Sequence, residues 1–264
     1  MTEPNLQYYC LGDHVTAFST MRQGGCSEGR YGEFNINRYC GDSEEAIRKN
    51  RTLLCKVLGV SDEHLLMPHQ VHLAKTAVVD DNFLQLTADE QQARLEGFDA
   101  LMTAVPEVCI GVSTADCVPV LLYDRRQRAA AAIHAGWRGT VQRIVEKTLA
   151  QMMAVYGSQA TDITAQIGPC IHLESFEVGD EVYQAFETEG FPMPPISRKY
   201  EKWHIDLPAC NRQQLLAGGV PASNIHISPV CTFQQSESYF SARRLGINSG
   251  RIYTGIVLRA AESL

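Results

Sequence analysis

The sequence of 264 residues lacks several features by which common protein classes are identified. It has no apolar run of 18 residues, so it offers no candidate membrane-spanning helix. The dinucleotide motif GxGxxG, the phosphate-binding P-loop and the GxSxG nucleophile motif are also missing, so those three classes have no support. Because no repeat, low-complexity segment or linker divides the chain, we expect a single domain over residues 1–264.

Positive charge and paired cysteines are also scarce. The 23 Lys and Arg against 30 Asp and Glu leave a net charge of −7, which argues against nucleic-acid binding and against a basic membrane surface. The nine cysteines are scattered, odd in number and free of CxxC pairs, so we expect a reducing compartment rather than a disulfide framework. The polar N-terminus does not resemble a signal peptide, and we therefore expect a cytoplasmic protein.

What is present is concentrated in residues 108–139. Two apolar runs, Val108–Val112 and Val118–Tyr123, are typical of buried strands. A charged turn at 124–127 then leads to a third predicted strand of small residues, Arg128–His134. The pattern predicts an antiparallel hairpin with polar and glycine-rich ends, where sites are usually built.

This hairpin brings a cysteine and a histidine together. If Tyr123 pairs with Arg128 across a four-residue loop, Cys117 lies opposite His134 on the same face of the sheet. Pro119 cannot donate to a strand ladder, which favours an edge, a bulge or an opening there and therefore an accessible Cys117.

A thiolate beside an imidazole permits more than one chemistry. The pair could act as nucleophile and base, it could supply two ligands of a zinc site, or it could be a buried thiol next to a hydrogen-bonded histidine. A third ligand would come from His69 or His72, which point to opposite faces if their segment is a strand. Spacing alone does not choose between these two.

The remaining secondary structure follows from caps, periodicity and glycines. The predicted helices are Glu44–Leu58, Val141–Tyr156 with Thr140 as its cap, Gly179–Phe186, and a helix from an Asp206 cap to Ala217. The predicted strands include Leu73–Val79, Ile163–Ile167 and Ile252–Leu258, and the proline-rich segment Phe191–Lys199 is expected to be a surface loop.

Four arginines stand beside turns or helix starts in this acidic chain. Arg22 precedes the pair Gly24-Gly25, Arg138 lies at the predicted helix start after His134, and Arg243 and Arg244 belong to a C-terminal block. They fit either a solvated surface or a wall that binds an anion.

With these pieces in place, the sequence resembles the YfiH/DUF152 proteins, also called the laccase-domain or polyphenol oxidase family. The matching pieces are Ser19–Gly25, Gln70-Val71-His72, Asp99-Ala100-Leu101, Ala115–Pro119, His134–Gly139, Ile167-Gly168-Pro169, Cys231-Thr232, Phe240–Arg244 and Gly250-Arg251. The resemblance covers nearly the whole chain and implies an α+β fold, a single domain with mixed β-sheet layers flanked by helices.

The resemblance also implies a zinc site with ligands at His72, Cys117 and His134, which selects His72 over His69. Three protein ligands leave a fourth position open, as in catalytic zinc. The implied reaction is the phosphorolysis of adenosine, inosine and 5′-methylthioadenosine, with adenosine deamination as a second activity. For the deamination we expect a nearby acid such as Asp116 to move protons.

Phosphate and purine nucleosides are the expected partners. For the phosphate we propose Arg22, Arg243 or Arg244 and the helix start near Arg138, and we place Gln70 among the substrate-binding residues.

Three alternative functions are also considered. Copper-dependent phenol oxidation has been attached to this family, and Cu²⁺ in the zinc site would explain weak oxidation, but eight histidines do not convincingly assemble a trinuclear copper cluster. A metal-free hydrolase would use Cys117 as nucleophile and His134 as base on an amide, as in the proposed editing of peptidoglycan precursors. A binding or scaffold protein with structural zinc is the last alternative.

Overall fold

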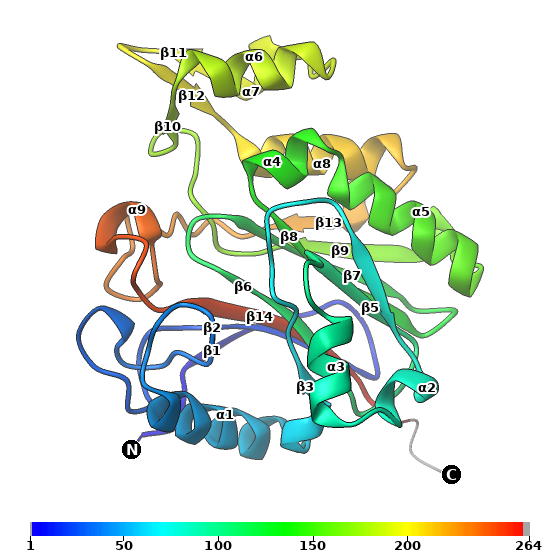
Figure 1. Ribbon diagram of the computed structural model, residues 1–264. Coiled ribbons are helices and arrows are strands. Elements are labelled where there is room, and N and C mark those ends of the chain that lie inside the picture. The colour runs from blue at the N-terminus through cyan, green and yellow to red at the C-terminus, as the bar shows by residue number, and fades with distance from the viewer. Residues whose placement is uncertain (1, 261–264) are drawn as a thin grey trace.

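The computed structural model describes residues 2–260 and contains two large β-sheets that lie face to face between layers of helices (Figure 1). The first sheet has the strand order β1 (Leu6–Tyr9), β2 (Val15–Thr20), β14 (Ile252–Leu258), β6 (Cys109–Thr114) and β3 (Leu65–Leu66). The second has the order β13 (Ile225–Ile227), β9 (Ile163–Ile167), β7 (Val118–Asp124), β8 (Ala129–Ala135), β5 (Ala100–Thr103) and β4 (Thr76–Val79). Both sheets mix parallel and antiparallel pairs, which confirms the predicted α+β class.

The core between the two sheets is built from alternating side chains of both. Ile110 and Ile256 from the first sheet pack with Leu101, Leu121 and Ala132 from the second, and all five are fully buried. The central strands β6, β7 and β8 are buried along their whole length, because each also faces a second apolar layer on its other side. This double burial explains why their sequences are continuous apolar runs rather than alternating ones.

Helices cover the outer face of each sheet (Figure 1). On the first sheet lies α1 (Glu44–Leu58), which begins at the Ser43 cap and ends at left-handed Gly59, as predicted. The second sheet is covered by α4 (Trp137–Val141), α5 (Ile144–Tyr156) and α8 (Leu207–Ala217). Within residues 2–260 no helix combines the length and apolar character needed to cross a bilayer.

The smaller elements lie at the ends of this sandwich. A third sheet of β10 (Glu177–Val178), β12 (Trp203–Ile205) and β11 (Ser197–Lys199) carries α6 (Asp180–Thr188) and α7 (Met193–Ile196) and stands beyond α4 and α8 (Figure 1). Three further short helices are α2 (Asp81–Leu84), α3 (Ala88–Arg94) and α9 (Ala242–Leu245). The segment 191–199 is therefore not the predicted surface loop, because Met193 and Ile196 are buried.

The predicted hairpin register was wrong by two residues. Tyr123 pairs with Ala130 rather than Arg128, and Pro119 rather than Cys117 faces His134. The loop starts one residue later because the Asp124 carboxylate accepts hydrogen bonds from the backbone N–H groups of the turn. A shift of two residues leaves Cys117 and His134 on the same face, so the two side chains still lie close together, as predicted.

The predicted helix start at Thr140 was also wrong. The Thr140 side chain is buried against the carbonyl of Ala135 and against Asn211 of α8, so it is not available as a cap. One short helix, α4, ends at Val141, and the left-handed residue Arg143 separates it from α5. The predicted strand Leu73–Val79 is likewise shorter, since β4 begins at Thr76.

Candidate metal centre

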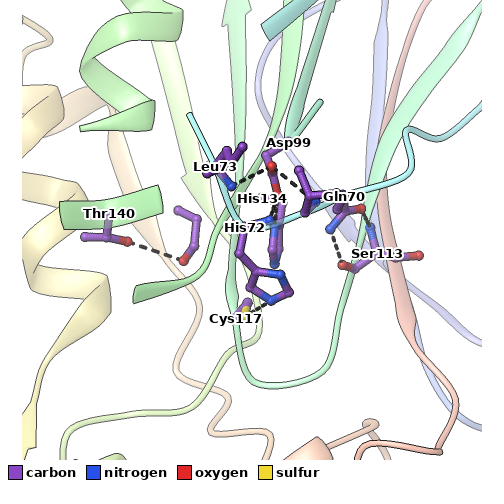
Figure 2. A network of polar contacts seen from close by, with 10 residues as sticks. Gln70, His72, Leu73, Asp99, Ser113, Cys117, His134 and Thr140 are labelled. Atoms are coloured by element: carbon purple, nitrogen blue, oxygen red, sulfur yellow. Dashed lines mark hydrogen bonds and ion pairs between the residues drawn. The ribbon is translucent and has the colours of Figure 1, made fainter. Parts of the chain in front are cut away.

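Three side chains converge where the two sheets meet (Figure 2). His72 lies in the loop before β4, Cys117 directly precedes β7, and His134 is near the end of β8. Their ligand atoms all lie within 4.8 Å of one another, and Cys117 Sγ is 3.9 Å from His72 Nε2. In the part of the chain that the structure describes, no other three His, Cys, Asp or Glu side chains gather in this way.

The three side chains differ in burial, so the cluster is open to solvent on one side only. His134 is 2% exposed, Cys117 is partly exposed, and His72 is open to solvent. A ligand or substrate must therefore approach from the side of His72. The other candidate, His69, points elsewhere: it stacks on Tyr39 at a centroid distance of 4.1 Å and its Nδ1 lies 2.6 Å from Glu96.

A glycine leaves room at the middle of the cluster. A Cβ atom on Gly136 would lie 3.0 Å from His72 Cδ2, 3.1 Å from Cys117 Sγ and 3.7 Å from His134 Cε1. Tetrahedral zinc with thiolate and imidazole ligands separates its donors by about 3.5 Å, so the 3.9 Å between Cys117 and His72 needs little closure. The donor types and the space beside Gly136 fit a divalent metal ion.

The cluster also changes the acidity of its members. Burial raises the pKa of the Cys117 thiol, but the charge and hydrogen bonds of His134 and His72 outweigh burial and lower this pKa to about 6. Burial lowers the pKa of His134, but Cys117 and Asp99 outweigh it and raise this pKa to about 9. Without metal, a thiolate next to an imidazolium is the favoured state, and a thiolate is the form that binds zinc.

Asp99 is the functional residue that sequence reasoning missed. It is fully buried directly before β5, and its carboxylate lies 2.8 Å from His134 Nδ1 (Figure 2). Ala100 pairs with Ile133, so the register of β5 on β8 places Asp99 beside His134. The sequence signal was an acidic residue directly before a buried strand, and it belongs to a piece that carries the family resemblance.

Asp116 and Gln70 lie beside the ligands, but their side chains contact the protein. Asp116 accepts hydrogen bonds of 2.7 Å from the Thr232 hydroxyl and from the backbone N–H of Arg243, so each carboxylate oxygen has a donor. The side-chain amide of Gln70 donates to the carbonyl of Ser113 and accepts from its N–H, at 2.8 and 2.7 Å (Figure 2). Both residues fix the loops that carry His72 and Cys117.

The four predicted arginines divide into two groups. Arg22 donates to the carbonyls of Gly32 and Ser236 and lies over the Phe240 ring, so its guanidinium is engaged in holding loops. The other three also lie over aromatic rings. The rings are Trp137 for Arg138 at 4.3 Å, Phe176 for Arg243 at 5.6 Å and Phe233 for Arg244 at 4.1 Å.

These three arginines are connected to the centre through the backbone. Arg138 is two residues from Gly136, the Arg243 N–H binds Asp116, and Phe233 follows Thr232, which also binds Asp116.

Fold and site together define a class, an α+β protein of two stacked mixed sheets with a His-Cys-His centre at their junction. The profile of the family described as multi-copper polyphenol oxidoreductase laccase matches residues 16–259. The chain belongs to this family, as the resemblance to the YfiH proteins predicted.

Relatives with names and structures support this assignment. The chain is 49% identical over 248 residues to a protein of Bacteroides thetaiotaomicron named purine nucleoside phosphorylase, covering 93% of this chain and 92% of that one. It is 47% identical over 247 residues to adenosine deaminase RL5 from an unknown prokaryotic organism, covering 92% and 93%. The crystal structure of the Bacillus licheniformis hypothetical protein YfiH superposes with a TM-score of 0.86 at 28% identity over 93% of each chain.

Proposed function

We propose that this protein is a zinc-dependent purine nucleoside phosphorylase that acts on adenosine, inosine and 5′-methylthioadenosine, with adenosine deamination as a side activity. The observation that carries the proposal is the cluster of His72, Cys117 and His134, buried on one side and open on the other. Three protein ligands with an open position are typical of catalytic rather than structural zinc. The names of the two similar relatives point to the same pair of reactions.

Zinc is the metal that we propose for these ligands. Bound there, it would supply Lewis acidity toward an electron-rich atom of the substrate. Copper prefers similar donors and binds them more tightly, so it could replace zinc in the same site. A multicopper oxidase needs additional clusters of histidines, and residues 2–260 contain no second group of three possible ligands.

The rest of the reaction falls to the protein's own side chains. Phosphorolysis requires groups that hold phosphate while the bond between purine and ribose breaks. We propose Arg138, Arg243 and Arg244 for this task, because all three are exposed and lie over aromatic rings. Arg243 donates one N–H group to the carbonyl of Glu177 at 3.1 Å, which leaves its other N–H groups for phosphate oxygens. For Arg22 the carbonyl contacts favour a role in holding loops.

Asp116 and Gln70 receive positioning roles in this proposal. Asp116 accepts a hydrogen bond from the backbone of Arg243 and thereby holds the segment of Cys117 at a fixed distance from the proposed phosphate site. Gln70 joins the loop of His72 to the end of β6.

The deciding experiment incubates the zinc-loaded protein with inosine and phosphate and measures ribose 1-phosphate. We expect turnover that falls by about 100-fold or more in Cys117→Ala, since losing a partner of a ligand alone costs 10–100-fold. Cys10→Ala, which removes an exposed thiol, is the matched control and keeps full activity. A wild-type protein that releases no ribose 1-phosphate from adenosine or inosine, and no 5-methylthioribose 1-phosphate from 5′-methylthioadenosine, would refute the phosphorylase.

A second function is favoured by one specific observation. Asp99, His134 and Cys117 form a chain in which a carboxylate orients an imidazole beside a thiol, the arrangement of a cysteine hydrolase that attacks amides. Alkylation of the metal-stripped and zinc-loaded proteins separates the two functions. Protection of Cys117 by zinc supports the metal enzyme, whereas equal reaction rates support the hydrolase.

A further inference from the structure

We propose that Asp99 is a positioning residue that prepares two of the three metal ligands at once, which rests on the proposed metal site. It fixes the ring of His134 so that the correct nitrogen faces the metal, and it holds the loop of His72 in its left-handed conformation. One buried carboxylate thereby couples two segments that are far apart in the chain (Figure 2).

The contact to His134 selects a tautomer. Asp99 Oδ1 lies 2.8 Å from His134 Nδ1, and both side chains are buried, so water does not compete for the contact. An ionised carboxylate can only accept hydrogen bonds. Nδ1 therefore carries the proton, and Nε2 is left as the metal ligand.

The contacts to the loop shape its backbone. Three successive N–H groups, those of Val71, His72 and Leu73, donate to the same carboxylate at 3.3, 2.9 and 2.8 Å. His72 has φ of 61°, a conformation that residues other than glycine rarely adopt. Successive N–H groups that converge in this way form a nest for an anion, and here the anion is Asp99.

Both roles meet on a single atom. Asp99 Oδ1 accepts from His134 Nδ1 and from the His72 N–H, while Oδ2 accepts from Val71 and Leu73. A change that disturbs Oδ1 therefore affects two ligands together, whereas a residue that oriented a single ligand would affect one. This is why we expect Asp99 to contribute more to metal affinity than its distance from the metal suggests.

Replacing Asp99 with Asn damages the site in either orientation of the amide. With the oxygen toward His134, the NH₂ group faces the N–H groups of Val71 and Leu73, and two donors oppose each other. With the amide flipped, the NH₂ group faces His134 Nδ1, which must then accept, so that the proton moves to Nε2 and blocks the ligand atom.

A matched control is available in the same sheet. Asp124 is also fully buried and accepts from two backbone N–H groups through Oδ1. Among the described residues its Oδ2 has no hydrogen-bond partner, so Asp124→Asn can keep both contacts. It lies at the far end of β7 from Cys117, away from the metal ligands.

The experiment measures zinc affinity by competition with a chromophoric chelator, and the Co²⁺ absorption spectrum of the same proteins. We expect Asp99→Asn to bind zinc about 100-fold more weakly and to show a changed Co²⁺ ligand field, because losing an outer partner of one ligand costs 10–100-fold. Asp124→Asn should keep the wild-type affinity and spectrum. An unchanged zinc affinity in folded Asp99→Asn would overturn the proposal.

If Asp99→Asn does not fold, the wild-type protein decides the matter. Long-range ¹H–¹⁵N NMR of zinc-loaded, histidine-labelled protein should show the His134 proton on Nδ1 and none on Nε2, and a proton on Nε2 with Nδ1 unprotonated would overturn the proposal. The outcome is separable from the proposed function. Zinc binding without phosphorolysis refutes the phosphorylase alone, and phosphorolysis with tight zinc binding in Asp99→Asn refutes the role of Asp99 alone.

Discussion

Cys117 experiences two opposing effects, and their balance decides its chemistry. Burial favours the neutral thiol, while the two imidazoles favour the thiolate and prevail, with a pKa of about 6. The buried cysteines Cys55 and Cys109 have no imidazole partners, and burial raises the pKa of the Cys55 thiol to about 11 and that of Cys109 to about 12. The proposed metal ligand is thus also the residue that we expect to be the reactive thiol.

The pH dependence of alkylation tests this balance. In the metal-free protein the rate at which iodoacetamide modifies Cys117 should rise with pH and reach half its maximum near pH 6, because only the thiolate reacts. Peptide mass spectrometry separates this thiol from the exposed Cys10. In His134→Ala the midpoint should move upward, and a wild-type midpoint near the ordinary value of 9 would contradict the assignment.

Gly136 tests the space at the centre. We expect Gly136→Ala to weaken zinc binding by about 10-fold or more, because its Cβ lies 3.0 Å from His72 and 3.1 Å from Cys117 and pushes the donors apart. The backbone there, with φ of −65°, accepts alanine without strain, so the fold should persist. Gly157→Ala at the end of α5 is the converse control, since it costs stability through its φ of 69° and leaves zinc affinity unchanged.

At the scale of elements, the break between α4 and α5 shows how one helix shapes another. Gln214 of α8 donates to the carbonyl of Thr140 and accepts from the N–H of Glu146, so it serves both helix ends at the break. The break matters for the site because α4 begins directly after Gly136. A straight helix through this region would change the positions of Trp137 and Arg138 relative to the His72, Cys117 and His134 cluster.

Replacing Gln214 tests the break. We expect Gln214→Leu to lower the free energy of unfolding by about 2 kcal/mol, because it removes a buried donor and acceptor and leaves their backbone partners unpaired. Urea unfolding followed by circular dichroism gives the value. Gln213→Leu, at the half-buried neighbouring position, should change stability by less than half as much, and equal losses would contradict the role of Gln214.

The same elements show what could be predicted from the sequence and what could not. The bounds of Ile163–Ile167 and Ile252–Leu258, and the helix capped by Asp206, were correct because their signals lie within the segment itself. The break at Arg143 was missed because it depends on α8, which follows some sixty residues later in the chain.

The site, too, has residues that local sequence pattern predicts and residues that it does not. Local pattern placed Cys117 and His134 on one face, whereas choosing His72 over His69 required the family resemblance. The role of Asp99 follows only from the pairing of β5 with β8 and from a loop whose backbone turns back on itself.

At the scale of the whole molecule, the centre ties the two sheets together. Cys117 lies in the connection from β6 of the first sheet to β7 of the second, and His134 belongs to the second sheet. A metal ion held by these residues binds the folded chain and not the unfolded one, so it stabilises the fold by mass action.

Thermal unfolding measures this linkage. Zinc at a concentration 100 times its dissociation constant should stabilise the protein by about 2.7 kcal/mol. For a chain of this size that corresponds to an increase of about 5–10 °C in Tm. The shift should disappear in Cys117→Ala and remain in Cys10→Ala, and a wild-type Tm insensitive to zinc would contradict the metal site.

The position of β14 has a consequence for how the protein is made. This strand separates β2 from β6 in the first sheet, so that sheet has no continuous ladder until β14 has been synthesised. All three proposed metal ligands precede it in the chain by more than a hundred residues. The second sheet, whose strands β4, β5, β7, β8, β9 and β13 all precede β14, can therefore pair its strands before the first sheet does.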